Sequence, residues 1–264
     1  MTTTSDTVFA GSVPALYDRC LGPMLFRPYA QDIAARAAAL QPARILETAA
    51  GTGIVTEALA AALPEAEIVA TDLNQAMLDV AAARGLPARV TFQAADAQAL
   101  PFPDGSFDLV LCQFGAMFFP DRVGAYREAR RVLRPPHGRF LFNVWDSLVH
   151  NPVSALLGDT VAALFPDDPP SFYRRIPFGY HDTAQIEADL RAAGFADIAI
   201  ETVSQVSRVD ARAAATGLCQ GSPMGAEIEA RGGDLEAVAN AATAALAEMD
   251  GREMPMSAHV ISAG

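Results

Sequence analysis

Residues Ile45 to Gly53 read Ile-Leu-Glu-Thr-Ala-Ala-Gly-Thr-Gly, an apolar strand pattern that runs into an acid and a turn of small residues. A small-residue turn between a buried strand and a helix lets the backbone approach a ligand, with the helix N–H groups pointing at it. The next apolar run ends in Asp72, and the one after it leads to Asp96. Three successive strands with an acid at or beyond each C-terminal end predict a nucleoside-binding edge of a parallel sheet.

Strand and helix patterns alternate from Arg44 onward, with short connections between them. Such alternation predicts right-handed βαβ units and a doubly wound α/β sheet. Two helical patterns precede it in residues 8–40. The expected strands are 45–48, 68–71, 90–92, 107–112, 139–144, 198–203 and 259–261, and the expected helices between them are 53–63, 75–84, 122–133, 182–194 and 234–249.

The composition is that of a globular protein with a large core: 264 residues, 51% of them hydrophobic and 19% charged. A formal net charge of −12 repels phosphate backbones and anionic lipid, which argues against nucleic acid and membranes as partners. The three cysteines and four histidines show no metal-ligand or disulfide spacing, so no metal is expected. The first residues lack the features of a secretory signal, and no apolar run approaches the roughly 20 residues of a membrane span. We therefore expect a cytoplasmic enzyme.

In their order and spacing, these motifs resemble the class I S-adenosylmethionine-dependent methyltransferases, in particular the small-molecule branch of the type 11, or UbiE-like, enzymes. The resemblance implies a Rossmann-like, mostly parallel seven-stranded sheet with an antiparallel last strand, N-terminal helices and an inserted lid. Ala49 stands where the family usually has glycine, which keeps the site small but loses free access to positive φ. The motifs are Glu47-x-Ala49-x-Gly51-x-Gly53, Asp72, Ala95-Asp96-Ala97, and residues 107–112, 130–135 and 190–195.

The resemblance implies one methyltransferase domain over residues 1–264. Residues 147–180, rich in proline and aromatic side chains, break the strand–helix rhythm and are expected to form an insertion. The expected parts are an N-terminal helical cover (1–43), a cofactor-binding core (44–146), lid or substrate segments (147–180 and 204–235), and the C-terminal part of the sheet (181–203 and 236–264).

The resemblance also implies S-adenosylmethionine as cofactor, with S-adenosylhomocysteine as product. Asp72 would accept hydrogen bonds from the ribose hydroxyls, because a carboxylate accepts two donors at once. Asp96 would accept from the adenine amine. Taken alone, Asp72 is also consistent with a helix N-cap, and Asp96 with a solvated loop acid. The further implied cofactor-binding residues are Tyr17, Glu47, Ala49, Gly51, Gly53, Leu73, Met77, Ala97 and Gln113.

Tyr17 is expected in an N-terminal helix that closes over the cofactor, where an aromatic face attracts a sulfonium. Leu73 and Met77 would sandwich the adenine, Ala97 would offer a backbone N–H, and Gln113 would lie near the methionyl end. For Met77 and Tyr17 ordinary core packing is the alternative.

The implied reaction is direct displacement of a methyl group from the positive sulfur onto an O, N or C nucleophile of a small molecule. No catalytic base stands out. His150 is a candidate, with a solvated loop histidine as the alternative. A set of aromatic and apolar side chains is expected either to line a substrate chamber or to serve as packing: Phe114, Met117, Phe118, Phe119, Phe165, Phe172, Tyr173, Phe178 and Tyr180.

Two other functions stay open. One is a binding or regulatory protein that keeps the fold and the S-adenosylmethionine pocket without turnover. The other is an NAD(P)-dependent oxidoreductase, although Thr56 replaces the third glycine that the dinucleotide-binding fingerprint needs.

Overall fold

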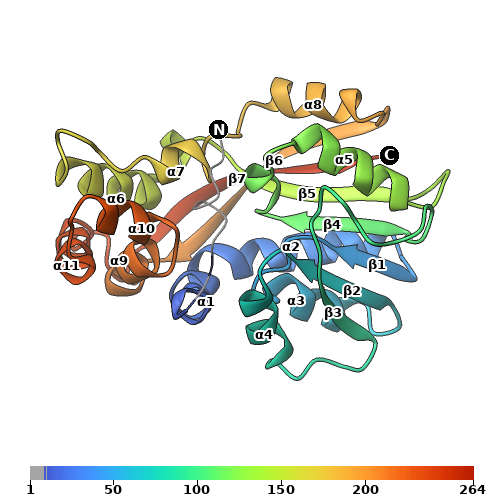
Figure 1. Ribbon diagram of the computed structural model, residues 1–264, viewed down its shortest axis with the longest axis horizontal. Coiled ribbons are helices and arrows are strands. Elements are labelled where there is room, and N and C mark those ends of the chain that lie inside the picture. The colour runs from blue at the N-terminus through green and yellow to red at the C-terminus, as the bar shows by residue number, and fades with distance from the viewer. Residues whose placement is uncertain (1–8, 10) are drawn as a thin grey trace.

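The computed structural model describes residue 9 and residues 11–264, which form a central sheet flanked by helices (Figure 1). Seven strands lie in the order β3-β2-β1-β4-β5-β7-β6. β1 to β5 pair in parallel, whereas β7 runs antiparallel to both β5 and β6. The predicted sheet with its antiparallel last strand is confirmed. The strands are β1 (Arg44–Glu47), β2 (Glu67–Asp72), β3 (Val90–Ala94), β4 (Leu109–Gln113), β5 (Arg139–Trp145), β6 (Ile198–Arg208) and β7 (Glu253–Ala263).

The topological switch point lies between β1 and β4, which are neighbours in the sheet. The strand that follows β1 in the chain, β2, lies on one side of this pair, and the strand that follows β4, β5, lies on the other. Residues 109–112 of β4 are fully buried, which fits their unbroken apolar pattern. At such a point the loops after the strands separate and leave a crevice at the carboxyl end of the sheet. The glycine-containing loop after β1 and the acids after β2 and β3 therefore meet at one edge.

Helices cover both faces of the sheet (Figure 1). α2 (Arg27–Ala39) packs beside α3 (Ile54–Ala62), and α5 (Arg122–Val132) packs beside α8 (Thr183–Ala192). α4 (Gln75–Ala82) follows β2. Aspartates define several helix starts: Asp121 accepts a hydrogen bond from the Gly124 N–H and Asp182 from the Ala184 N–H, so each carboxylate caps its helix.

The N-terminal segment forms a short helix α1 (Val13–Leu16), a π-helix (Tyr17–Phe26) and then α2. The π-helix packs against a lobe of helices that lies beyond the ends of β6 and β7, at the left of Figure 1. The lobe consists of α6 (Pro152–Ala163), α7 (Phe172–Arg175), α9 (Ala211–Gln220), α10 (Met224–Ala230) and α11 (Leu235–Ala245).

The structure corrects the predicted bounds of the last two strands. β6 continues past Val203 to Arg208, and β7 begins at Glu253 instead of His259, so the two strands pair along their whole length. In β6 half-buried and exposed residues largely alternate and the sequence is polar, as fits an edge strand; apolar runs therefore underestimate its length.

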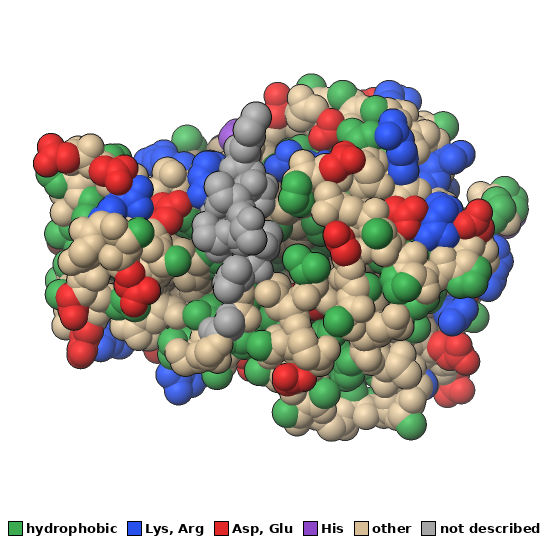
Figure 2. All heavy atoms as spheres, in the orientation of Figure 1, with side chains coloured by type: hydrophobic (Ala, Val, Ile, Leu, Met, Phe, Trp, Pro, Cys, Tyr) green, Lys and Arg blue, Asp and Glu red, His purple; other side chains and the backbone are tan. Residues whose placement is uncertain are grey.

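The surface carries both signs of charge. Acidic and basic side chains are interspersed over the face shown in Figure 2. Within the described part of the chain, none of the helices is both long and apolar enough to cross a membrane.

Candidate functional site

A cavity opens at the predicted crevice, with an empty volume of about 860 Å³. We call it the loop cavity, since the loops after β1, β2, β3 and β4 form it. Its lining residues are Phe9, Tyr17, Ala49, Gly51, Asp72, Leu73, Asn74, Met77, Ala95, Asp96, Ala97, Gln98, Gln113, Phe114, Gly115, Phe118, Phe119 and Pro120.

Asp72 ends β2 at the centre of this cavity and is 7% exposed. Its Oδ2 accepts a hydrogen bond from the Gly51 N–H at 2.9 Å, and its Oδ1 accepts one from the Asn74 N–H at 2.8 Å. Burial raises its pKa above the ordinary value, although these hydrogen bonds act in the opposite direction. Asn74, not Asp72, is the N-cap residue of α4. The carboxylate thus fixes the loop and keeps lone pairs for further donors.

Asp96 and Leu73 complete the side of the cavity next to Asp72. Asp96 is half-buried, and its Oδ1 accepts a hydrogen bond from the Gln98 N–H at 2.8 Å, which fixes the carboxylate in a local turn. Leu73 is 59% exposed, whereas Met77 is buried. An exposed leucine in the same cavity as two carboxylates offers an apolar surface to a flat ring. Asp72, Leu73, Met77, Asp96 and Ala97 are therefore brought together, as predicted.

The loop after β1 has left-handed backbone at three positions: φ is +52° at Ala49, +56° at Gly51 and +79° at Gly53. Ala49 and Gly51 line the cavity. Gly53 does not, and a Cβ there would lie 2.8 Å from the Cβ of Ala81. Gly53 therefore allows α3 and α4 to pack closely.

Glu47 also lies outside the cavity lining. It is 1% exposed, and its carboxyl accepts a hydrogen bond from the Thr56 hydroxyl at 2.7 Å. Burial raises the pKa of Glu47 to about 8. Glu47 thus ties β1 to α3 from beneath the loop.

The N-terminal π-helix is fastened to the loop through Asp18. Asp18 accepts a hydrogen bond from the Thr52 hydroxyl at 2.7 Å and pairs with Arg84, which also donates to the Thr52 carbonyl at 2.6 Å. Tyr17 stacks on Phe26 with ring centroids 4.8 Å apart. This anchoring places the Tyr17 ring at the mouth of the loop cavity, where the sequence predicts a cover.

Gln113 ends β4 beside the loop. Its amide donates to the Phe26 carbonyl at 3.1 Å and accepts from the Asn143 amide at 3.3 Å. These bonds join the cover to the sheet and hold Gln113 in the wall.

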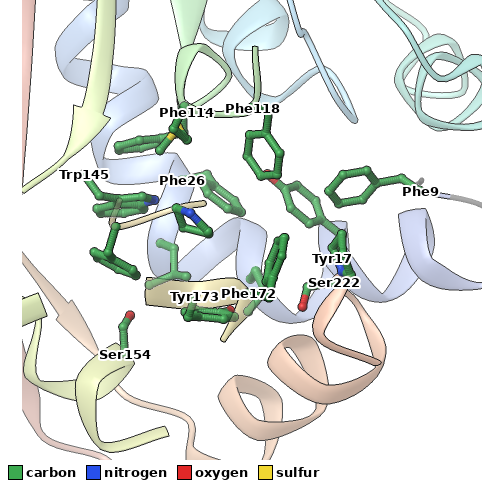
Figure 3. Close-up of a pocket in the computed structure, with 16 residues that line it drawn as sticks. Phe9, Tyr17, Phe26, Phe114, Phe118, Trp145, Ser154, Phe172, Tyr173 and Ser222 are labelled. Carbon is green, nitrogen blue, oxygen red and sulfur yellow. The ribbon is translucent and has the colours of Figure 1, made fainter. Parts of the chain in front are cut away.

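A second cavity adjoins the first, with about 490 Å³ of empty space when the open solvent at its mouth is included. Figure 3 shows the residues that line it. We call it the aromatic cavity. It shares Phe9, Tyr17, Phe114 and Phe118 with the loop cavity. The rest of its lining is almost entirely apolar: Leu21, Leu25, Phe26, Met117, Trp145, Ser154, Phe172, Tyr173, Pro177, Phe178, Ser222 and Pro223.

Phe114 stands at the junction of the two cavities. Its φ is +50°, and its ring stacks on Trp145 with centroids 3.9 Å apart and planes inclined by 6°. The Phe114 N–H donates to the side-chain oxygen of Asn143 at 3.0 Å, which helps to hold this backbone. Strained backbone that the surroundings fix in this way is common at ligand sites.

Six of the predicted chamber residues line the aromatic cavity, namely Phe114, Met117, Phe118, Phe172, Tyr173 and Phe178; Phe119 lines the loop cavity instead. Phe165 and Tyr180 line neither. Phe165 packs near Gly233 in the helical lobe, and the Tyr180 hydroxyl donates to Asp189 at 2.8 Å. Sequence reasoning missed Phe26, Trp145, Ser154 and Ser222. Only Trp145 carried a signal, because it ends β5 at the same sheet edge.

His150 lies outside both cavities. Its side chain is 60% exposed, and its Nδ1 is 2.8 Å from Asp146 Oδ2. In residues 9 and 11–264 no group of three or more His, Cys, Asp or Glu side chains is placed to hold a metal ion.

Comparison with known proteins agrees with this architecture. Residues 45–136 match the family model described as "Methyltransferase domain". The chain is 44% identical over 112 residues to a ubiquinone/menaquinone biosynthesis C-methyltransferase of Methylobacterium nodulans, a match that covers 41% of this chain and 44% of that protein. It is 38% identical over 132 residues to a demethylmenaquinone methyltransferase of Deinococcus radiodurans, which covers 48% and 55%. The chain thus spans about half the length of these relatives.

Among solved structures, the [4+2]-cyclase SpnF superposes with a TM-score of 0.64 at 22% identity, over 100% of this chain and 97% of that one. The YcgJ protein of Bacillus subtilis superposes with a TM-score of 0.57 at 20% identity, over 89% and 97%. At this level of identity the likeness concerns the fold, which extends over nearly the whole chain.

Proposed function

We propose that this protein transfers a methyl group from S-adenosylmethionine to a small-molecule acceptor. The match of residues 45–136 to a methyltransferase domain and the similarity to methyltransferases of known name support this proposal. The observation that carries the proposal is the meeting of Gly51, Asp72 and Asp96 in one cavity. The acidic surface makes a nucleic acid an unfavourable acceptor.

The loop cavity has the chemistry that an adenosyl group needs. Asp72 has lone pairs for the ribose hydroxyls, and Asp96, in the same cavity, is the acceptor that we propose for the adenine amine. Leu73 and Met77 offer apolar contact to the two faces of the ring. Glu47 and Gly53, which lie beneath the lining, act on the cofactor only through the shape of the loop.

S-adenosylmethionine, when bound, supplies a methyl group on a positively charged sulfur. The protein's part is to align the acceptor and to exclude water. Tyr17 and Phe118 border both cavities, so their rings define the passage between the donor and the acceptor. Tyr17 also offers a π-face to a sulfonium at that point.

Calorimetric titration with S-adenosylhomocysteine tests cofactor binding. We expect the protein to bind it, and to be stabilised against heat by it but not by NADH. Asp72→Asn should weaken binding at least tenfold, because a charged hydrogen-bond acceptor contributes about 1.5–3 kcal/mol. Asp79→Asn, on the exposed side of α4, is the matched control and should bind like the unmodified protein. Absence of binding to the unmodified protein overturns the proposal.

Turnover needs its own test, because a structure of this fold is a [4+2]-cyclase and fold does not fix activity. We expect transfer of a labelled methyl group to at least one member of a panel of phenols, amines and carboxylic acids. Tight binding of S-adenosylhomocysteine without transfer to any of them would favour the non-catalytic alternative.

A further inference from the structure

Building on the proposed function, we propose that the aromatic cavity takes a planar aromatic acceptor with an acidic hydroxyl, and that the acceptor reacts as the anion formed by its own ionisation in water. The protein then supplies no general base. Three features of the aromatic cavity carry this inference: the shape of its walls, its position, and the kinds of side chain in its lining.

The walls are flat. Phe114 and Trp145 present a parallel stack, and Phe26 and Tyr17 form a second one (Figure 3). Tyr173 and Phe178 form a third, with centroids 6.1 Å apart. Stacked rings that are held by one another leave flat faces with little freedom to adapt. Such faces favour a rigid planar molecule, because offset stacking adds to the burial of apolar area.

The position of the cavity suits an acceptor. It borders the loop cavity through Tyr17, Phe114 and Phe118. Gln113, which lines only the loop cavity, precedes Phe114 in the chain. A ring in the aromatic cavity therefore lies next to the end of the loop cavity beside β4, where the amino-acid part of the cofactor is proposed to lie.

The described residues that line the aromatic cavity include no Asp, Glu, His, Cys, Lys or Arg. The protonated side chains there are Tyr17, Tyr173, Ser154 and Ser222. Burial raises the pKa of both tyrosines, so their hydroxyls keep the proton and act as hydrogen-bond donors. None of these groups removes a proton from the acceptor near neutral pH.

The ionisable groups around these tyrosines do not change that conclusion. Cys219 faces Tyr173 from α9, and burial raises the pKa of its thiol to about 12. Asp72 and Asp18 act on Tyr17, and as negative charges they raise its pKa further. Arg175, on the same helix as Tyr173, pairs with Glu227 of α10. Arg174, which follows Tyr173 in the same helix, pairs with Asp159 of α6.

An apolar cavity favours this reaction for an anion. The bond from the acceptor oxygen to the methyl carbon forms as the bond from sulfur to that carbon breaks. The opposite charges on oxygen and sulfur disappear together, leaving a neutral ether and a neutral sulfide; the proton is already in the solvent. A site of low polarity raises the free energy of the two reacting ions more than that of the transition state, in which their charges are partly neutralised, so the barrier falls. With a neutral amine, a positive charge would remain in the cavity.

The test uses 2-naphthol and a series of ring-halogenated 2-naphthols that differ in acidity. We expect each to be methylated, and the lower-pH midpoint of kcat/KM to move in step with the acceptor's own pKa, since this profile reports groups of the free reactants. Tyr173→Phe and Tyr17→Phe should leave the midpoints in place even where they lower the rate. A midpoint that stays at one pH for all acceptors identifies a protein base and overturns the inference.

The controls separate this inference from the proposed function. Tyr180→Phe removes a hydroxyl outside the cavity and should leave the midpoints in place. If S-adenosylhomocysteine binds and 2-naphthylamine or an aliphatic acid is methylated while no naphthol is, the acceptor class is wrong and the proposed function stands. If S-adenosylhomocysteine does not bind, the proposed function itself fails.

Discussion

At the scale of single residues, two non-glycine side chains hold left-handed backbone where the cavities meet. Ala49 and Phe114 have φ values of +52° and +50°. Gly115 follows Phe114, and a Cβ on it would lie 2.5 Å from the Cβ of Ala49. Ala49 therefore packs against the residue that follows Phe114, and only glycine at 115 permits this contact. Strain of this kind costs free energy of folding, and it persists because the surrounding structure leaves no alternative.

The strain at Ala49 is directly testable. Ala49→Gly should raise the free energy of unfolding by up to about 1 kcal/mol, because glycine adopts positive φ without a steric penalty. Binding of S-adenosylhomocysteine should be kept. Urea denaturation measures the change. Ala50→Gly is the matched control: Ala50 is buried and its φ is not left-handed, so this variant should lose stability. A destabilised Ala49→Gly would show that the methyl group matters more than the strain.

Glu47 should make folding depend on pH. Its pKa is about 8 in the folded protein against 4.5 for the ordinary side chain. Between these values the folded state holds a proton that the unfolded state lacks. The stabilising contribution is thus complete below pH 4.5 and is lost as the pH rises to 8. With about 1.4 kcal/mol per pH unit, the loss from pH 6.0 to 7.5 reaches about 2 kcal/mol.

Urea denaturation at pH 6.0 and 7.5 measures this loss. Glu47→Gln keeps an acceptor for the Thr56 hydroxyl and should lower the dependence on pH. Glu67→Gln changes a side chain that is 71% exposed and should keep the behaviour of the unmodified protein. Equal pH dependence in all three proteins would contradict the assignment to Glu47.

At the scale of elements, the sequence predicted the strands and helices whose residues follow a local hydrophobic pattern. β1, β2 and β4 are apolar runs that end in acids or turns, so their positions were nearly right. β6 was predicted too short because polar and apolar residues alternate along this edge strand. α6 was missed because its buried apolar residues, Val153, Leu157 and Val161, lie among small residues after Pro152. The length of β6 and the position of α6 therefore depend on contacts with elements that are distant in the sequence.

The contact between the π-helix and α9 shows the same dependence on distant elements. A Cβ on Gly217 of α9 would lie 2.6 Å from Leu21 Cγ and 3.0 Å from Cys20 Cβ. Gly217→Ala should therefore lower the free energy of unfolding by about 1–3 kcal/mol through overpacking, despite the better helix propensity of alanine. Gly158→Ala, in α6 with open space around it, should raise it by about 0.5–1 kcal/mol. Thermal unfolding of the two variants measures the difference, and a stabilised Gly217→Ala would contradict this packing.

At the scale of the whole molecule, one cavity is formed by the loops of the core sheet, and the other lies between the core sheet, the N-terminal cover and the helical lobe. Except for Gly115, the acids and small residues of the loop cavity lie within about fifty residues of one another, from Ala49 to Ala97, and follow a sequence pattern. The aromatic cavity takes Phe26 from the N-terminal cover, Trp145 from β5 and Ser222 from the lobe. No local pattern relates these positions, so the sequence identified the first cavity and only part of the second.

The shared wall predicts that ligands of the two cavities bind cooperatively. Phe9, Tyr17, Phe114 and Phe118 border both, so a ligand in either cavity orders rings that the other one needs. We expect S-adenosylhomocysteine to tighten the binding of 2-naphthol at least fivefold, and 2-naphthol to tighten that of S-adenosylhomocysteine by the same factor, as linkage requires. Four calorimetric titrations measure both factors, because each of the two ligands is titrated with and without the other.

Two variants locate the coupling in this wall. Phe118→Leu changes a shared ring and should lower the factor toward one. Phe178→Leu changes a ring of the aromatic cavity alone, so it should weaken the binding of 2-naphthol while the factor stays unchanged. The comparison isolates the shared rings because each substitution replaces a phenylalanine of the aromatic cavity by leucine, and only Phe118 also lines the loop cavity. A factor of one in the unmodified protein, with both ligands binding, would mean that the core and the lobe recognise their ligands independently.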